Sequence, residues 1–249
     1  MSVIGALWLR QLKRFSRSRK RILGILGQPL LFLVAFGFGM GPIYERAGQG
    51  NYIQFLAPGI IGMTVMFAGF VSGVELIFDR QFGFLKATLV APVPRRLIMI
   101  GRTLGSATIA MIQGTLVIGV CSIFGFRPGS MIGLVMGLGF MALIALLFTA
   151  IGTAVASLIE DFQAFQLFTN FFMMPMFFLS GALFPLRNVA GGLRAIARLD
   201  PFAYGVDGLR TAMIGGSSQF GVRADIVVLA VLVLFFIAAG ARLFSKIQI

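Results

Sequence analysis

The chain has 249 residues, of which 58% are hydrophobic and 12% charged, and this balance predicts a membrane protein rather than a soluble globular domain. Its net charge is +13, but the basic residues lie at the ends of apolar segments, so we attribute them to membrane orientation and expect no nucleic-acid partner. The chain has no histidine and a single cysteine, which excludes disulfides within the chain, histidine-cysteine metal sites and histidine-dependent nucleophiles. It also has no G-x-x-x-x-G-K-[ST] phosphate loop and so no ATP hydrolysis by such a loop. We therefore expect no enzyme activity, metal or cofactor in this chain.

Residues 1–21 form the first predicted element, an amphipathic helix that runs into a basic cluster. Apolar side chains recur at helical spacing, and basic side chains cover the opposite face. A basic helix with tryptophan on its apolar face is typical of a helix in the lipid headgroup plane, so we expect contact with membrane lipids. A contact with a cytosolic partner is the alternative, and the two are compatible. The apolar residues are Ile4, Leu7, Trp8, Leu12 and Phe15.

Six uncharged segments follow, each long enough to cross a bilayer. A hydrocarbon core about 30 Å thick needs roughly 20 apolar residues of helix. These segments predict an all-α membrane protein with six transmembrane helices. The predicted spans are residues 22–44, 47–74, 103–126, 128–159, 162–186 and 226–241.

The basic residues predict the orientation of these spans. An even number of spans places both termini on one side, together with the segment 79–102. That side carries 14 of the 21 lysine and arginine residues. Because basic residues accumulate in cytoplasmic loops, we expect both termini in the cytosol.

The segment between spans two and three, residues 79–91, is predicted to be an amphipathic helix. Apolar residues recur at i, i+4, i+7 and i+11, and Pro92 ends the helix because proline lacks an amide proton. This pattern favours equally a docking surface for a cytosolic partner and a helix that lies in the lipid interface. The apolar residues are Phe78, Phe82, Leu85 and Leu89.

Spans two and five carry methionine, aromatic and amide side chains that we predict to line a substrate pathway. Methionine is flexible and polarizable, and suits a bulky amphipathic substrate. Each of these residues could instead face lipid or pack in the core. The predicted pathway residues are Met63, Met66, Phe67, Asn170, Phe171 and Met174, with Met173 beside them.

About 40 residues separate spans five and six, which is long for a plain loop. Apolar residues recur there at helical spacing, and Asp200-Pro201 and Gly215-Gly216 interrupt the pattern. We therefore predict short helices within residues 187–218 that dip back toward the bilayer from the outside. The residues on the apolar face are Phe202, Val206, Leu209 and Met213.

Two stretches resemble the ABC-2 type permeases, the membrane subunits of ABC exporters such as drug-resistance, nodulation-factor and O-antigen exporters. The first is Asp79-Arg80-Gln81-Phe82-Gly83-Phe84-Leu85-Lys86, continued to residue 95. The second is Phe178-Leu179-Ser180-Gly181-Ala182-Leu183-Phe184-Pro185, followed by residues 200–210. The resemblance covers the whole chain in order, so it implies that residues 1–249 form a single ABC-2 type transmembrane domain.

The resemblance also implies partners and a coupling site. In that family the loop after span two is a coupling helix in a groove of an ATPase subunit, and the outer helices after span five are re-entrant. Here the coupling residues would be Asp79, Arg80, Gln81, Phe82, Gly83, Leu85, Lys86, Leu89 and Pro92, with Asp79 and Gln81 where many relatives carry glutamate. The implied assembly holds a second permease copy in a homodimer and two ABC ATPase subunits, which bind ATP and Mg²⁺, in a bacterial cytoplasmic (inner) membrane.

We therefore expect the permease subunit of an ATP-driven exporter that moves a drug, a lipid or a lipid-linked glycan outward by alternating access. The spans carry no ionisable residue at mid-bilayer depth for proton or sodium coupling, so the energy is expected from a separate ATPase. The alternative is a membrane scaffold or passive channel without an ATPase partner. A membrane-embedded enzyme is disfavoured because Asp200, Asp207 and Asp225 are scattered along the outer segment.

Overall fold

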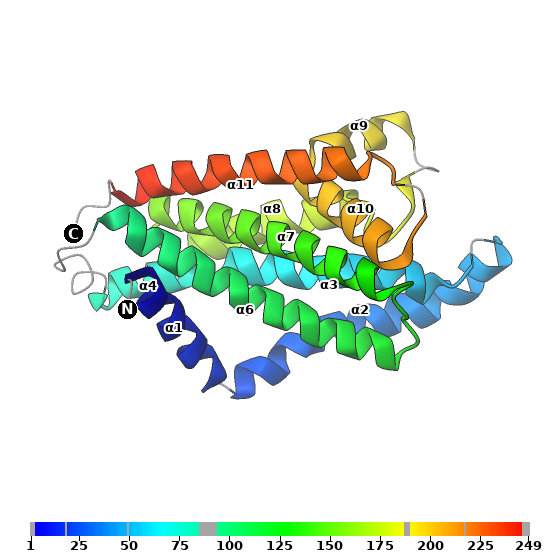
Figure 1. Ribbon diagram of the computed structural model, residues 1–249, viewed down its shortest axis with the longest axis horizontal. Coiled ribbons are helices and arrows are strands. Elements are labelled where there is room, and N and C mark those ends of the chain that lie inside the picture. The colour runs from blue at the N-terminus through cyan, green and yellow to red at the C-terminus, as the bar shows by residue number, and fades with distance from the viewer. Residues whose placement is uncertain are drawn as a thin grey trace.

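The computed structural model describes residues 3–17, 19–48, 50–84, 94–186, 190–216 and 218–245, which form a bundle of α-helices without a β-strand (Figure 1). The start of α1, α4 and the end of α11 lie at one end of the bundle, which we call the α4 end. Helices α9 and α10 lie at the other, the α10 end. The helices are α1 (Val3–Ser16), α2 (Arg19–Arg46), α3 (Tyr52–Val71), α4 (Val74–Gln81), α6 (Arg95–Ile123), α7 (Met131–Leu158), α8 (Phe162–Leu179), α9 (Gly191–Leu199), α10 (Pro201–Ile214) and α11 (Val222–Ser245).

Six helical segments of the described chain are long and apolar enough to cross a membrane, which confirms the predicted all-α fold and number of spans. The fifth ends earlier than predicted, because Ser180 caps α8 and Gly181 adopts a φ of +80°, which stops a helix. The sixth begins earlier than predicted, because α11 already includes the buried Asp225. The segments are Leu26–Arg46, Tyr52–Gln81, Arg95–Ile123, Met131–Leu158, Phe162–Leu179 and Val222–Phe244.

Helix α3 lies at the centre of the bundle and packs against α2, α6, α7 and α10. Where α3 and its continuation cross α7, the two backbones touch. A Cβ added to Gly73 would overlap the carbonyl oxygen of Gly152, and one added to Gly152 would overlap the carbonyl oxygen of Phe70. Only glycine allows helices to approach so closely, so this crossing fixes the middle of the bundle.

The segment that follows α3 departs from the predicted helix 79–91. A turn at Ser72 and Gly73 separates α3 from α4, and α4 ends at Gln81. Gly83 then adopts a φ of +75°, in the left-handed region that favours glycine. Asp79 therefore belongs to the end of a helix that starts at Val74, which corrects the predicted start at residue 79; the predicted part from 85 to 91 lies outside the described residues.

Helix α1 packs on α6 rather than lying free of the bundle. Gly101 and Gly105 let its backbone approach, with Leu7 and Gln11 directly above them. Trp8 Nε1 donates a hydrogen bond of 3.1 Å to Thr108 Oγ1. Protein therefore covers one face of α1, and its place in the headgroup plane stays a prediction.

At the α10 end, α10 packs against α3, α7 and α11. The predicted apolar face is confirmed, because its four side chains are fully buried. Gly205 and Gly208 bring α10 against Ile144 and Phe140 of α7. The re-entry of this segment into the bilayer stays a prediction. The buried face consists of Phe202, Val206, Leu209 and Met213.

Candidate functional site

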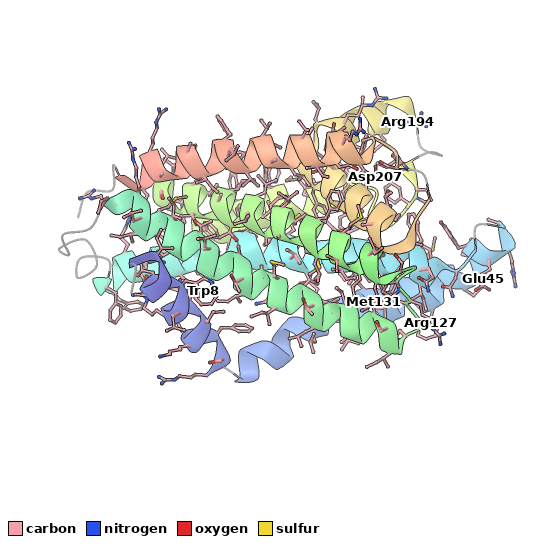
Figure 2. All side chains as sticks on the ribbon, in the orientation of Figure 1. Trp8, Glu45, Arg127, Met131, Arg194 and Asp207 are labelled. Atoms are coloured by element: carbon pink, nitrogen blue, oxygen red, sulfur yellow. The ribbon has the colours of Figure 1, made fainter. Side chains whose placement is uncertain are left out.

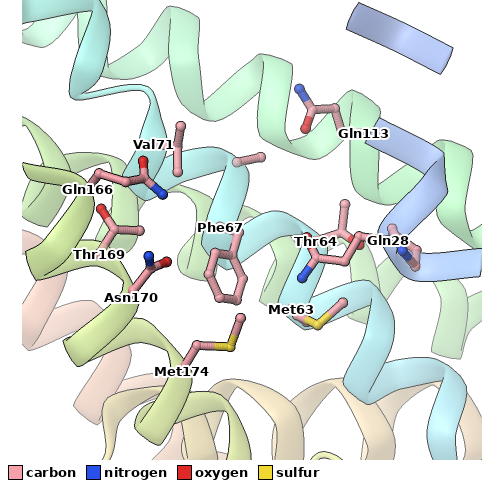
Figure 3. Close-up of a pocket in the computed structure, with 12 residues that line it drawn as sticks. Gln28, Met63, Thr64, Phe67, Val71, Gln113, Gln166, Thr169, Asn170 and Met174 are labelled. Carbon is pink, nitrogen blue, oxygen red and sulfur yellow. The ribbon is translucent and has the colours of Figure 1, made fainter. Parts of the chain in front are cut away.

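A pocket of about 370 Å³ lies among α2, α3, α6 and α8 (Figure 3). Helix α3 contributes lining residues at helical spacing from Met63 to Val71, and α8 does so from Gln166 to Met174. One stripe of each helix therefore faces the cavity. The lining residues are Gln28, Pro29, Met63, Thr64, Phe67, Ala68, Val71, Gln113, Gln166, Thr169, Asn170 and Met174.

The described lining contains amides, hydroxyls, thioethers and one aromatic ring, and no charged side chain. Thr64 Oγ1 donates to the carbonyl of Ile60 at 2.9 Å, and Thr169 Oγ1 to that of Phe165 at 2.7 Å, so each hydroxyl keeps lone pairs for a further donor. The amide side chains can both donate and accept. The pocket is therefore suited to an uncharged group that is polar on one side and apolar on the other.

Four of the predicted pathway residues line this pocket, namely Met63, Phe67, Asn170 and Met174. The others do not line it, and their place in a substrate pathway stays a prediction. Met66 and Met173 are fully buried in the hydrophobic core. Phe171 is 85% exposed, because it follows Asn170 by about 100° of helical turn and so points away from the cavity.

Sequence reasoning missed the amides from α2, α6 and the first half of α8, which are Gln28, Gln113 and Gln166. They converge on the pocket from three helices (Figure 3). Burying an amide without a hydrogen-bond partner is costly, so a glutamine inside an apolar span indicates a polar site, and the sequence does show these glutamines. Their common pocket could not be read from one sequence.

At the α4 end, the predicted coupling residue Asp79 faces inward. Its Oδ2 accepts a hydrogen bond of 2.5 Å from Arg102 of α6, and both side chains are buried. Arg10 of α1 lies 3.8 Å from the same oxygen. The structure thus makes Asp79 part of an internal ion pair, which corrects its placement on a docking surface.

The next two predicted coupling residues hold the turn between α7 and α8. Arg80 pairs with the Glu160 carboxylate at 3.1 Å and donates to the carbonyl of Ser157. Gln81 Nε2 donates to the carbonyl of Glu160 at 3.3 Å. The end of α4 is therefore fastened to that turn.

The exposed part of the predicted coupling segment begins at Gln81. Phe82 is 70% exposed and Phe84 is 65% exposed, on either side of Gly83. The Phe82 ring also lies against that of Phe78, with centroids 6.1 Å apart. Four further predicted coupling residues, Leu85, Lys86, Leu89 and Pro92, lie outside the described residues.

The sequence model of the ABC-2 type transporter family matches residues 2–214. This chain belongs to the ABC-2 type transporter family. It is 29% identical over 213 residues to Nodulation protein J of Rhizobium meliloti (strain 1021), covering 84% of this chain and 80% of the relative. It is 30% identical over 248 residues to the putative transport permease ycf38 of Cyanophora paradoxa, covering 95% and 84%. The ycf38 permease of Pyropia yezoensis is 33% identical over 222 residues, covering 83% and 72%.

This ABC-2 protein also holds a polar cluster at the α10 end that the sequence did not reveal. Asp207 and Asp225, 18 positions apart, both contact the Ser218 hydroxyl, at 2.7 and 3.4 Å. Asp207 Oδ2 also accepts from the backbone amides of Gln219 and Phe220. The cluster therefore fixes the turn that leads from α10 into α11 in this ABC-2 chain (Figure 2).

The other charged groups of that end hold α10 in place. The Arg210 guanidinium lies 3.8 Å from the Phe55 ring centroid and donates to the carbonyls of Phe55, Gly181 and Ala182. Burial lowers the pKa of Arg210 to about 10, so it stays charged at neutral pH. Burial raises the pKa of Asp200, which caps α10 through the amide of Phe202, to about 7.

Proposed function

We propose that this chain is the permease subunit of an ATP-driven exporter that moves an amphipathic substrate outward across a bacterial inner membrane. The observation that carries the proposal is the uncharged, amide-lined pocket between spans in a chain of the ABC-2 family. The pocket combines polar and apolar walls, as a drug, a lipid or a lipid-linked glycan would require. The relatives' names, a nodulation protein and a transport permease, agree with this class of activity.

The energy for this movement would come from a separate ABC ATPase, with ATP and Mg²⁺ bound there. ABC-2 permeases generally pair with such a subunit. Phe82 and Phe84 support a protein contact at the α4 end, because two large exposed rings follow the last turn of α4. With both termini cytosolic, as the basic residues favour, these rings would face the ATPase.

The working unit would be a homodimer with two ATPase subunits. The outward faces of α2 and α8, the helices beside the pocket, are apolar and exposed, with Leu31, Phe38, Leu167 and Phe171 on them. A second copy related by a two-fold axis could cover these faces and close a pathway between the two pockets. Alternating access would then be the rocking of one copy against the other.

The coupling part of the proposal is tested by the association of the permease with its cognate ATPase. Replacing both exposed rings, as Phe82→Glu and Phe84→Glu, should weaken co-purification by about tenfold or more, since such aromatic anchors dominate interfaces. The control is Arg127→Gln, which changes an exposed residue at the α10 end and should leave association intact. Undiminished association of the double variant would contradict the docking assignment. Substrate flux without any ATPase would favour the passive channel instead.

A further inference from the structure

A set of charged side chains from α1, α4 and α6 meets at the α4 end of the bundle, and we call it the α4 charge cluster. Two acidic residues stand one helical turn apart on α4, and two basic residues stand one turn apart on α1. The fifth member is Arg102 of α6. The cluster consists of Arg10, Arg14, Glu75, Asp79 and Arg102.

The ion pairs of this cluster fall into two classes by distance and exposure. Arg102 and Asp79 lie 2.5 Å apart, with side chains 6% and 11% exposed. Arg10 lies 3.8 Å from Asp79 and Arg14 4.0 Å from Glu75; the two arginine side chains are 47% and 54% exposed, whereas the two carboxylate side chains are each 11% exposed, so these pairs are longer and open to water on the arginine side. Breaking a buried pair leaves a desolvated charge and is costly, whereas an exposed pair contributes little.

The backbone of α4 lies against α7 and α8 rather than against the helices that supply the arginines. Helix α4 packs on α7 and α8, and the Phe78 ring stacks on that of Phe162 with centroids 5.5 Å apart. The turn at Ser72 and Gly73 separates it from α3. Arg10, Arg14 and Arg102 link α4 to α1 and α6 through charged side chains, and such links can yield without repacking a core.

From these contacts we infer that Arg102 is a positioning residue that holds α4 against α6, and we call this contact the pin. Arg10 and Arg14 form a weaker, reversible link, the grip, through which α1 moves together with α4. This inference rests on the proposed function, because α4 leads directly into the proposed ATPase-coupling segment. A force on that segment reaches α4 first. The buried pair then passes it to α6, and the exposed pairs pass it to α1, which already packs on α6.

The strengths of the pairs decide which contact yields. An exposed ion pair changes an equilibrium by a factor of about two, so the loss of both should raise the population of ungripped α1 about fourfold. Loss of the buried pair should destabilise the whole bundle, with a fall in the thermal midpoint of about 10 °C. The link between α1 and α4 is thus the weaker of the two, while α4 and α6 stay together.

The test measures the distance between α1 and α4 with spin labels at Ser16→Cys and Gln81→Cys, two exposed positions, in a Cys121→Ser background. We expect a narrow distance distribution in this parent chain in detergent. The change of Arg10→Gln with Arg14→Gln should add a second, broader population about four times larger than in the parent. The matched control, Lys13→Gln with Arg17→Gln, removes the same charge from α1 and the turn that directly follows it, and should leave the distribution narrow.

The same labels then follow the complex with the ATPase. In the parent, ATP with vanadate should leave the α1–α4 distance narrow, because the two helices move together. In the Arg10→Gln, Arg14→Gln variant it should spread. An unchanged distribution in that variant overturns the grip, and so does a parent distance that spreads with nucleotide.

The positioning role of Arg102 has its own measurement. The charge swap, Asp79→Arg with Arg102→Asp, should restore much of the thermal midpoint that Arg102→Asp alone loses, whereas the α1–α4 distance should stay broad because Arg10 then faces an arginine. A swap that restores nothing overturns the pin. A chain that fails to bind any ATPase contradicts the proposed function instead, while the distances in the chain alone still decide the grip.

Discussion

At single positions, the candidate site depends on polar side chains placed inside an apolar bundle. Gln28, Gln113 and Asn170 reach one pocket from three helices, and none of the described lining carries a charge. Each of these residues stands out in the sequence as an amide within a span. Their convergence depends on how α2, α6 and α8 pack around α3, which no local pattern encodes.

The glycines of α7 allow a prediction with a built-in control. Gly152 touches the backbone of α3, so Gly152→Ala should destabilise the chain by about 1–3 kcal/mol through overpacking. A Cβ at Gly139 of the same helix meets nothing within 4 Å, so Gly139→Ala should be neutral or stabilise by about 0.5–1 kcal/mol. Thermal unfolding in detergent measures both. Equal effects of the two changes would contradict the proposed crossing of α3 and α7.

Among the helices, the elements set by local periodicity were predictable and those set by distant partners were not. The six spans and the buried face of α10 follow from apolar spacing alone. The start of α4 did not, because the same spacing predicted a helix that begins only at residue 79; the predicted residues 85–91 lie outside the described part of the chain. Asp79 turns inward to Arg102, 23 positions away, and Gly83 breaks the helix. Likewise, composition chose Phe171 for the pathway, whereas the rotation of α8 turns it away.

Helix α10 offers a test of how the α10 end is held. Arg210 joins α10 to α3 through Phe55 and to the end of α8 through two carbonyls. Arg210→Lys keeps the charge but loses the planar fork, so exchange of amide hydrogens across residues 190–216 should speed up about 5- to 30-fold. Arg127→Lys, at an exposed position of the same end, is the control and should change nothing. Unaltered exchange in the Arg210 variant would mean that other contacts hold α10.

For the whole molecule, the structure combines a pocket among the spans with an α4 end whose helices are held by side-chain ion pairs. The pocket lies beside α2 and α8, whose outer faces are apolar and exposed. The α4 end carries two exposed rings next to the α4 charge cluster. In the proposed exporter, work enters at the rings, passes along the bundle through α4 and α6, and changes which side of the membrane the pocket faces.

The most direct test of this account is the accessibility of the pocket from outside. We would place a cysteine at Asn170 in a Cys121→Ser background, reconstitute the permease with its ATPase, and measure labelling by a membrane-impermeant maleimide. ATP with vanadate is expected to change the labelling rate at Asn170→Cys by about tenfold or more, as alternating access requires. A cysteine at the exposed Arg127, at the α10 end, should be labelled at the same rate with and without nucleotide. A labelling rate at Asn170→Cys that nucleotide leaves unchanged would contradict the account.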